Sequence, residues 1–370
     1  MSRLLVLNTG SSSVKFRLFD FAEEIVLLAG GKVTDIGGAA MFSAQEEGEP
    51  KQEHPLAPNA SHEEAIDLIL TWLTHRSLTI RAAAHRIVHG GEKFFTATRL
   101  DDSSLDYLRS LSPLAPLHQP HNLAAVDILQ KRQPDMPQYG CFDTAFHARH
   151  DPLFHEFALP ETLREKGIKR YGFHGLSYDW IAHSLKSDYP HLYAGKVVAA
   201  HLGNGASLCA LRNGQSIDTT MGMTALDGLP MGSRVGAIDA GAVIYMLNEL
   251  NMSVDEVEKI LYNESGLKGL SGLSNDVKIL SESTDKNAKF ALEYFALKTA
   301  QYIAAMAVSI GGMDGLIFTG GIGENAENVR RWVLDHLAHL PDFELHIIPA
   351  NEERAMAQDI WENFKSEITA

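Results

Sequence analysis

Five short segments place ionisable side chains among apolar or glycine residues, a setting in which a simple solvated charge is not expected. A guanidinium is a planar fork of N–H donors that fits the oxygens of a carboxylate or a phosphate. Two arginines, with histidine donors beside them, could therefore bind an anion and stabilise charge that develops on it. Each segment alone could be structural, and a given histidine or arginine is more often a packing, surface or ion-pair residue. The segments are His85–Glu92, Pro116–Pro120, Phe142–His147, Arg170–Gly175 and Gly232–Gly236.

Three turns rich in small residues could bind phosphate groups. Asn8–Lys15 carries glycine, serines and a lysine between two strand-like runs, and Gly203–Ser207 repeats this arrangement. Gly320–Asn325 lies between a buried strand-like run and a helical pattern. Small residues let backbone amides approach an anion closely, and a helix N-terminus adds donors. The alternative for the first turn is an ordinary polar hairpin tip.

Familiar nucleotide-binding signatures are absent or weak. The chain has no GxxxxGK[ST] motif and no protein-kinase signature. Gly321–Ala326 fits G-x-G-x-x-A, with Glu344 about twenty residues further on, as in a dinucleotide fingerprint. This match occurs late in the chain, with no clear βαβ series before it, so NAD binding stays a minor alternative. Any ATP chemistry would use another phosphate cradle.

Composition narrows the class of protein. The 370 residues include 32 basic and 47 acidic side chains, a formal net charge of −15. No basic run stands out, so we expect neither nucleic acid nor an anionic membrane as a partner. Met1–Leu7 leads directly to Asn8 without a cleavage-site pattern, which predicts a cytoplasmic location. Cys141 and Cys209 lack metal-binding spacing and are expected to be buried, reduced thiols.

The hydrophobic pattern alternates between strands and helices throughout, which predicts an α/β fold. Two capping boxes, at Ser61–Glu64 and Ser253–Glu256, predict helix starts. Gly311 should end a long helix that begins near Ala288. Helices are also expected at 104–111, 121–131, 325–339 and from 351, and strands at 4–7, 14–19, 25–28, 40–43, 82–88, 138–142, 197–201, 208–211, 316–319 and 345–348.

The strand–turn–strand pattern at the N-terminus recurs near residue 197. Asn8–Ser12 and Asn204–Ser207 occupy equivalent places in the two copies. Such internal repetition predicts two related α/β halves. The matched stretch is short, so chance similarity between two hairpins is the alternative on this observation alone.

The complete set of motifs resembles the acetate kinase family, part of the wider sugar kinase, heat-shock ATPase and actin superfamily. The matching motifs run in the family's order over nearly the whole chain: NTGSSSVK, HRIVHGGE, FDTAFH, RYGFHG, HLGNGAS, DTTMG, MGSR, GGIGEN and PANEE. The resemblance implies two domains with a duplicated ribonuclease H-like, or actin-like ATPase, core. We expect the first at residues 1–142 plus 353–370, for the acid and the metal, and the second at 143–352, for the nucleotide.

The resemblance also implies roles for individual residues in the reversible transfer of a phosphoryl group from ATP to acetate. The catalytic residues would be Arg86, Asp143, His174 and Arg234. The acid would contact Arg86, Val88, Leu117, His118, Phe173 and Ala225. ATP or ADP would contact Ser11, Ser12, Lys15, His201, Leu202, Gly203, Asn204, Gly205, Asp276, Lys278, Gly321, Ile322, Gly323, Glu324 and Asn325. Asn8 and Glu352 would position Mg²⁺, or Mn²⁺ in its place, and the family implies a homodimer.

One mechanistic point does not need the resemblance. A substrate carboxylate resembles a glutamate side chain, whose pKa is about 4.3, so it is already ionised at pH 7. It can attack phosphorus without a general base. We therefore expect Asp143 to orient Mg²⁺ and its waters, or to hold an arginine, rather than to abstract a proton.

The chain departs from the family pattern at three places, and these leave its specificity open. Lys278 stands where the family commonly has arginine, so nucleotide discrimination could be looser. Gly236–Ala240 lacks a usual aspartate and proline close to Arg234. Ala225 replaces a proline of the acyl pocket, and one methylene changes discrimination there by only about 1–3 kcal/mol. Propionate or another short-chain acid is therefore the alternative substrate, and a nucleotide-gated binding protein the alternative outside enzymes.

Overall fold

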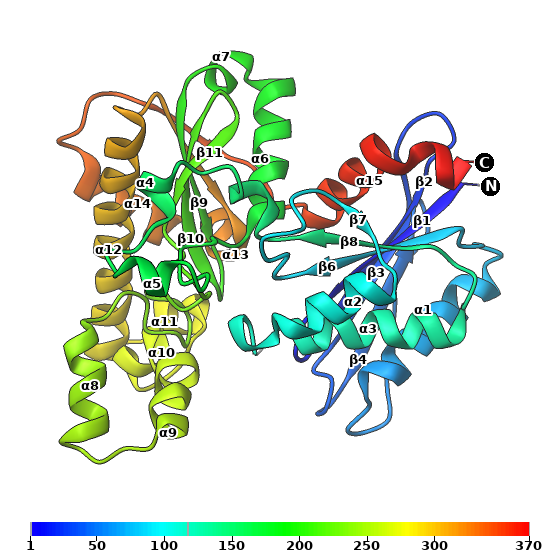
Figure 1. The fold of residues 1–370 in the computed structure, drawn as a ribbon, viewed down its shortest axis with the longest axis horizontal. Coiled ribbons are helices and arrows are strands. Elements are labelled where there is room, and N and C mark those ends of the chain that lie inside the picture. Colours follow the sequence, from blue (N-terminus) through cyan, green and yellow to red (C-terminus); the bar gives the residue numbers. More distant parts are fainter. Residues whose placement is uncertain (1, 117, 370) are drawn as a thin grey trace. The chain divides into compact units, whose positions relative to one another are not determined.

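The chain forms two compact α/β units, each with its own mixed sheet (Figure 1). The computed structural model describes residues 2–116 and 118–369. Unit 1 comprises Met1–Ala145 and Asn351–Ala370, and unit 2 comprises Phe146–Ala350. Asp143 and Glu352 thus belong to unit 1 by their contacts, although the boundaries expected from the sequence place them at the two ends of the second half.

Unit 1 contains an eight-stranded sheet in the order β5-β4-β3-β2-β1-β6-β8-β7. The first three strands pair antiparallel, whereas β1, β6 and β8 are parallel neighbours. The three parallel strands therefore end at the same edge of the sheet. The strands are β1 (Arg3–Thr9), β2 (Val14–Asp20), β3 (Val26–Thr34), β4 (Met41–Glu46), β5 (Gln52–Pro55), β6 (Ala82–Ile87), β7 (Thr98–Arg99) and β8 (Gln138–Phe142).

Helices cover both faces of this sheet (Figure 1). On one face, Leu5 and Leu7 of β1 share a core with Phe16 and with Trp72. Successive side chains of a strand point to opposite faces, so Leu4 and Val6, which are also fully buried, face the C-terminal helix that packs on β1. The helices are α1 (His62–His75), α2 (Asp102–Ser110), η1 (Ser112–Leu114), α3 (Gln119–Arg132) and α15 (Glu352–Thr369), and η2 (Ala145–His147) follows β8.

The five-stranded sheet of unit 2, in the order β11-β10-β9-β12-β13, repeats this design. Its first three strands are antiparallel neighbours, and β9, β12 and β13 are parallel ones. The strands β3-β2-β1-β6-β8 of unit 1 have the same order and senses. The predicted duplication is therefore confirmed at the level of topology. The strands are β9 (Lys196–Leu202), β10 (Ala206–Arg212), β11 (Gln215–Thr219), β12 (Gly315–Thr319) and β13 (Glu344–Ile347).

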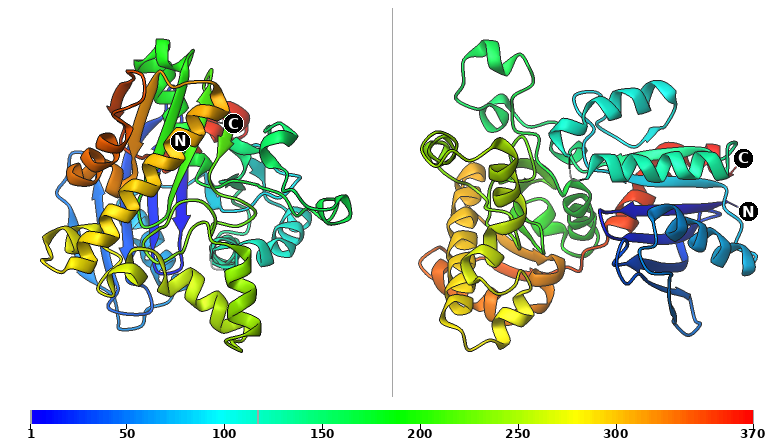
Figure 2. Two further views of the ribbon diagram at one scale, coloured as in Figure 1. Left: turned by 90° about the vertical axis from the view of Figure 1, so that its left-hand side faces the viewer. Right: turned by 90° about the horizontal axis from the view of Figure 1, so that it is seen from below.

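The helices of unit 2 flank this sheet, and the longest, α12, runs along the unit (Figure 2). It ends at Gly311, whose φ of 73° suits glycine, as the sequence predicted. Both predicted capping boxes are present. The helices are α4 (Pro152–His155), α5 (Glu161–Arg164), α6 (Gly175–Asp188), α7 (Pro190–Tyr193), α8 (Ala240–Asn248), α9 (Val254–Lys259), η3 (Ile260–Glu264), α10 (Gly266–Ser271), α11 (Val277–Glu282), α12 (Lys286–Ile310), α13 (Gly320–Asn325) and α14 (Glu327–Leu337).

One local prediction was wrong. The segment Gly320–Gly323 was expected to be a turn that leads into a helix from about Asn325, but Gly320–Asn325 is itself the short helix α13. Gly320 makes this possible, because its φ is 78° and a Cβ there would lie 2.7 Å from the carbonyl oxygen of Leu202. The chain can therefore turn directly from β12 into a helix, which ends at Ala326 before α14 begins.

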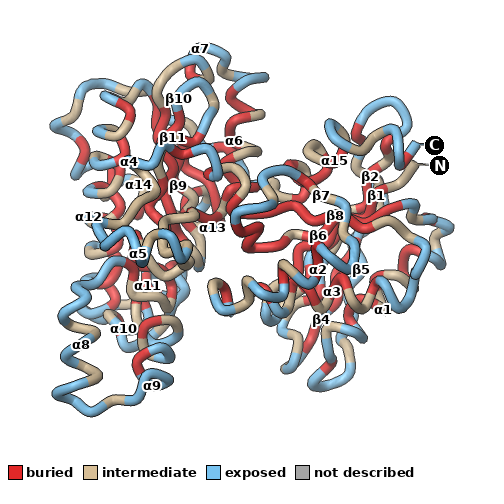
Figure 3. The backbone as a smooth tube through the Cα atoms, in the orientation of Figure 1, coloured by how far each residue is buried: buried red, intermediate tan, exposed pale blue. Residues whose placement is uncertain are grey.

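The central strands of both units are buried and the outer helical faces are exposed (Figure 3). Cys141 and Cys209 are buried free thiols, as expected. Over residues 2–116 and 118–369, no helix has both the length and the apolar character that crossing a membrane would require.

A buried histidine in the core of unit 1 predicts sensitivity to acid. His85 is 1% exposed, donates through Nε2 to Gln138 Oε1 at 2.7 Å, and has no partner for Nδ1 among the described residues. Burial lowers its pKa to about 4, whereas an unfolded histidine has a pKa of about 6.5. As the pH falls below 6.5, this histidine takes up a proton in the unfolded chain but stays neutral in the folded protein. The free energy of unfolding therefore decreases as the pH falls from 6.5 to about 4.

We expect His85→Gln, which cannot titrate, to lose less stability than the wild type between pH 7 and pH 5. One histidine contributes at most about 1.4 kcal/mol per pH unit, so the difference should be about 1–2 kcal/mol. Urea unfolding at the two pH values measures it. Equal losses in both proteins would show that His85 titrates normally in the folded state.

Candidate functional site

In unit 1, polar side chains gather where the three parallel strands end. Asn8 lies near the end of β1, Arg86 near the end of β6, and Asp143 directly after β8. In an open sheet, ligands bind beyond the carboxyl ends of parallel strands, at the point where neighbouring connections diverge. The fold thus brings together three of the predicted site residues that lie far apart in the sequence.

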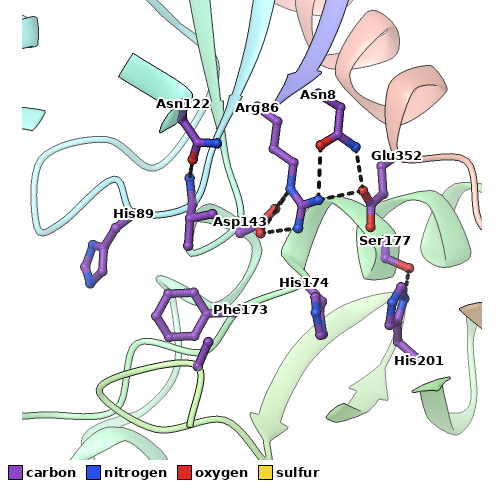
Figure 4. Close-up of polar contacts among 12 residues, drawn as sticks. Asn8, Arg86, His89, Asn122, Asp143, Phe173, His174, Ser177, His201 and Glu352 are labelled. Carbon is purple, nitrogen blue, oxygen red and sulfur yellow. Dashed lines mark hydrogen bonds and ion pairs between the residues drawn. The ribbon is translucent and has the colours of Figure 1, made fainter. Parts of the chain in front are cut away.

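Arg86 is the centre of this group (Figure 4). Its Nε and Nη2 donate to the carboxylate of Asp143, with a shortest distance of 2.7 Å between Nη2 and Oδ2. Its Nη1 donates to Glu352 Oε2 at 3.0 Å and to Asn8 Oδ1 at 3.3 Å. The guanidinium is therefore held by acceptors on β1, directly after β8 and on α15, and these acceptors fix its plane.

Burial and neighbouring charges shift the pKa values of Arg86 and Asp143 in opposite directions. Desolvation would lower the pKa of Arg86, but the charges of Asp143 and Glu352 raise it overall. Burial raises the pKa of Asp143, and the ion pair with Arg86 opposes that rise. The bidentate geometry at 2.7 Å favours an ionised pair.

Asn8 also connects the C-terminal helix to the first strand. Its Nδ2 donates to Glu352 Oε2 at 3.1 Å and to Glu353 Oε1 at 3.0 Å. Carboxylates in the first turn of α15 are favoured by the helix dipole. Unit 1 thus presents oxygen atoms from one amide and from carboxylates, the donor set that Mg²⁺ prefers alongside water and phosphate oxygens.

Two buried amides of α3 hold the backbone beside Arg86. Asn122 donates through Nδ2 to the Thr9 carbonyl at 2.6 Å and accepts from the Val88 amide at 3.0 Å. Gln119 accepts from the His89 amide at 3.1 Å and donates to its carbonyl at 3.0 Å. Sequence analysis assigned no role to either residue, because a polar side chain on a helix reveals no partner. Gln119 lies within the segment Pro116–Pro120 that it singled out, and Asn122 follows three residues later.

The remaining predicted residues of unit 1 are placed as follows. Ser11 and Ser12 lie at the exposed tip of the β1–β2 hairpin, and Lys15 is exposed on β2 opposite Asn8. Val88 is buried directly after β6. His118 is the residue that precedes α3. Leu117 lies outside the described residues.

In unit 2, His174 adopts a backbone conformation that is unusual for its type. Its φ of 58° places it in the left-handed region immediately before α6, a conformation that costs on the order of 1–3 kcal/mol and is found often at functional sites. Its ring stacks on that of His201, with centroids 4.4 Å apart. His201 Nδ1 lies 2.8 Å from Ser177 Oγ (Figure 4).

Two nitrogen donors of unit 2 face the glycine turn after β9. A Cβ at Gly205 would lie 3.1 Å from His174 Nε2 and 3.9 Å from Arg234 Nη1. The missing side chain therefore leaves room for both donors at one point of the turn. Arg234 Nη1 also donates to the carbonyl of Ala225 at 3.0 Å. Phe173, next to His174, is buried.

Unit 2 also contains a cavity of about 520 Å³ beside this turn. Seven predicted residues line it: Gly203, Asn204, Asp276, Lys278, Gly321, Ile322 and Asn325. Sequence analysis named none of the other five as nucleotide contacts: Asn275, Val277, Ser281, Ala326 and Asn328. The volume lies in the range typical of small-molecule sites.

Other predicted nucleotide contacts lie outside this lining. Leu202 is fully buried on β9, and Gly323 is buried in α13. The carboxylate of Glu324 accepts from the backbone amides of Gly320 and Ala350, at 3.0 Å and 2.9 Å. Glu324 therefore fastens the start of α13 to the segment that leads to α15.

The comparisons with known proteins agree with one another. The model of the acetokinase family matches residues 3–358. An acetate kinase of Rhodopseudomonas palustris is 41% identical, with 97% of each chain covered, and a propionate kinase of Escherichia coli O157:H7 is 40% identical over 96% of this chain and 95% of its own. The crystal structure of a propionate kinase from Francisella tularensis matches with a TM-score of 0.90 at 34% identity, covering 97% of this chain and 99% of that one.

The bridging role of Asn122 predicts an unusual pH dependence in a variant. Asn122→Asp keeps an acceptor for the Val88 amide but sets a buried carboxylate against the Thr9 carbonyl. At pH 7.5 we expect a loss of about 2–4 kcal/mol in unfolding free energy. Protonation of the aspartate at lower pH restores a donor, so the loss relative to the wild type should shrink toward pH 5.

Chemical denaturation of both proteins at the two pH values measures this difference. Asn122→Ala, which cannot regain a donor, is the matched control and should show a constant deficit. An Asn122→Asp deficit that does not change with pH would contradict the bridge.

Proposed function

The chain belongs to the acetokinase family, and we propose that it transfers the γ-phosphoryl group of ATP to acetate, giving acetyl phosphate and ADP, with Arg86, His174 and Arg234 as the donors to the transferring group. The fold is that of the acetate and propionate kinases, an actin-like ATPase fold. Acetate is better supported as the acceptor than propionate. The observation that carries the assignment of residues is the fixed guanidinium of Arg86 among Asn8, Asp143 and Glu352.

We assign the acid and the metal to unit 1, and the nucleotide to unit 2. The cavity beside Gly203 has the size for a nucleoside. Its wall carries a carboxylate, a serine hydroxyl and side-chain amides, which can form hydrogen bonds with a nucleoside. One oxygen of Asp276 caps α11 by accepting from the amides of Lys278 and Ile279. The second carboxylate oxygen suits a ribose hydroxyl. The amides of the Gly203 turn and of the α13 start suit phosphate oxygens.

The acceptor needs no base, since its carboxylate is ionised at neutral pH. Asp143 is engaged with Arg86 through three N–H···O contacts. We therefore propose that Asp143 holds Arg86 in the plane that grips the substrate's oxygens. Arg86, Arg234 and His174 then stabilise the charge that spreads over the equatorial oxygens of the phosphoryl group, which supplies most of the catalysis in such reactions.

A divalent cation fits the donors of unit 1. Asn8, Glu352 and Glu353 offer hard oxygen ligands, although no compact group of three or more acidic or histidine ligands occurs in the described residues. That pattern suits Mg²⁺, which keeps several waters and binds substrate phosphates with one or two protein carboxylates. When bound, the cation would neutralise charge on the β- and γ-phosphates. Asn8 and Glu352 would orient its waters.

The cellular location, the oligomeric state and the partners of the enzyme are also part of the proposal. We propose a cytoplasmic homodimer that uses ATP or ADP and acetate or acetyl phosphate, and that binds neither nucleic acid nor membrane. The net charge of −15 supports the last part, because both of those surfaces are anionic.

Two arginine variants test the assigned donors. Arg86→Lys keeps the charge beside Asp143 but removes the planar fork, and Arg234→Ala removes a side chain held by a carbonyl. Each should lower kcat by about 10²–10³ without unfolding the protein. The exposed Arg109→Ala is the control. Coupled assays for ADP release, with circular dichroism for folding, measure both effects. If a variant keeps more than a tenth of wild-type kcat, the arginine that it replaces is not a donor to the transferring group.

Substrate preference tests the acyl pocket. We expect propionate to be accepted with kcat/KM within about 10²-fold of acetate. Ala225→Pro should shift preference toward acetate because it adds bulk to one wall, and Val88→Ala toward propionate because it removes bulk. Steady-state kinetics on both acids decides. If neither change moves the ratio threefold, these residues do not line the pocket, and the assignment as a kinase is unaffected.

A further inference from the structure

The imidazole of His174 is held on its Nδ1 side by two buried hydroxyls of unit 2. His174 Nδ1 lies 2.8 Å from Ser207 Oγ, and Ser207 Oγ lies 2.5 Å from the hydroxyl of Tyr178. Ser207 and Tyr178 are both fully buried. Ser207 belongs to β10 and Tyr178 to α6, so the two hydroxyls come from a strand and a helix of unit 2.

The direction of these hydrogen bonds follows from counting protons. Burial raises the pKa of Tyr178 well above its ordinary value, so the phenol keeps its proton. The phenol oxygen also has a hydrogen bond with the His201 backbone, whose N–H can only donate. Ser207 Oγ, 2.5 Å away, is a side-chain acceptor within reach of the Tyr178 proton. Ser207 therefore accepts from Tyr178 and directs its own proton to His174 Nδ1.

An imidazole nitrogen that accepts a hydrogen bond carries no proton, so the ring proton must lie on Nε2. This is the nitrogen that faces the glycine turn, 3.1 Å from the position of a Cβ on Gly205. The turn is the one assigned to phosphate binding. The ring thus presents an N–H donor where an anion would bind.

Arg234, which faces the same glycine position as the ring, disfavours a positive charge on His174. Arg234 Nη1 faces the same glycine position at 3.9 Å, and His201 stacks on the ring at 4.4 Å between centroids. His147 lies behind the preceding peptide and donates through Nε2 to the Phe173 carbonyl at 3.0 Å. Burial lowers the pKa of His147 to about 4, so this neighbour stays neutral at pH 7.

We propose that Ser207, supported by Tyr178, is a positioning residue that holds His174 as a neutral imidazole with its proton on Nε2. His174 then serves as a hydrogen-bond donor to the transferring phosphoryl group and does not act as a base. This inference rests on the proposed function for its catalytic consequence, but the state of the ring can be measured without any turnover. It also explains why a strained backbone is tolerated at His174, since the hydroxyl pair fixes where the ring points.

The test compares Ser207→Ala and Tyr178→Phe with the wild type. Ser184→Ala is the matched control, because it removes a buried hydroxyl of α6 that donates to the Trp180 carbonyl. Histidine labelled with ¹⁵N and ¹³C reports the protonated nitrogen of His174 by NMR between pH 5.5 and 8, with His174→Gln to assign the signal. Rates and KM values come from the coupled assay.

We expect wild type and Ser184→Ala to show a neutral ring with the proton on Nε2 over this range. In Ser207→Ala the ring should take up a proton at higher pH than in the wild type, and kcat should fall about tenfold or more while KM for ATP changes less than about threefold. Tyr178→Phe should shift both quantities in the same direction by less. If Ser207→Ala does not fold, Tyr178→Phe decides.

The inference would be overturned if Ser207→Ala and Tyr178→Phe fold and their His174 ring shows the same NMR signal and the same titration as in the wild type. A wild-type His174 that carries its proton on Nδ1 would also overturn it. If His174→Gln keeps full activity, the proposed catalytic role of His174 fails, and the NMR result still decides whether Ser207 sets the state of the ring.

Discussion

The ion pair between Arg86 and Asp143 is the interaction on which the arrangement of unit 1 depends. Asp143 is 1% exposed, and a buried carboxylate without its partner typically costs about 3–5 kcal/mol. The strand that carries Arg86 and the strand that ends before Asp143 must therefore stay in register. Glu352, far along the chain, binds the same guanidinium. The C-terminal helix α15 therefore packs on unit 1 through its apolar face and through the ion pair between Glu352 and Arg86.

The repeated topology gives each unit the same way to present polar groups. In each, a first strand turns back through a hairpin of small residues, and parallel neighbours end beside that hairpin. In unit 1 the strand ends carry charged side chains that bind one another. In unit 2 the equivalent edge is built mainly from glycine turns and imidazoles, next to a cavity. One design therefore supports two chemistries: a fixed charge in the first unit, and backbone donors around an open volume in the second.

The parts of this structure that the sequence predicted are those with a local physical cause. Capping boxes, the stop at Gly311 and the strand at Gln138–Phe142 depend on neighbouring residues, and all are confirmed. Asn122 and Ser207 could not be assigned, since their partners lie far away in the sequence. The cavity wall was found where it coincides with glycine motifs or with Asp276 and Lys278, which the family resemblance indicated. Its other members, such as Asn328, reach it because α13 ends after a single short run, which the pattern did not indicate.

The acidic net charge of the chain bears on which side chains can serve as hydrogen-bond donors to an anionic substrate. With a net charge of −15, the protein repels anionic substrates at long range. It could counter this with many lysines, but flexible ammonium groups are strongly hydrated and poorly fixed. Instead, unit 1 sets the plane of Arg86 with several acceptors, and unit 2 holds Arg234 against a carbonyl and His174 against a buried hydroxyl. Donors fixed in advance need no reorganisation when charge develops on phosphoryl oxygens, and that is where their energetic effect is largest.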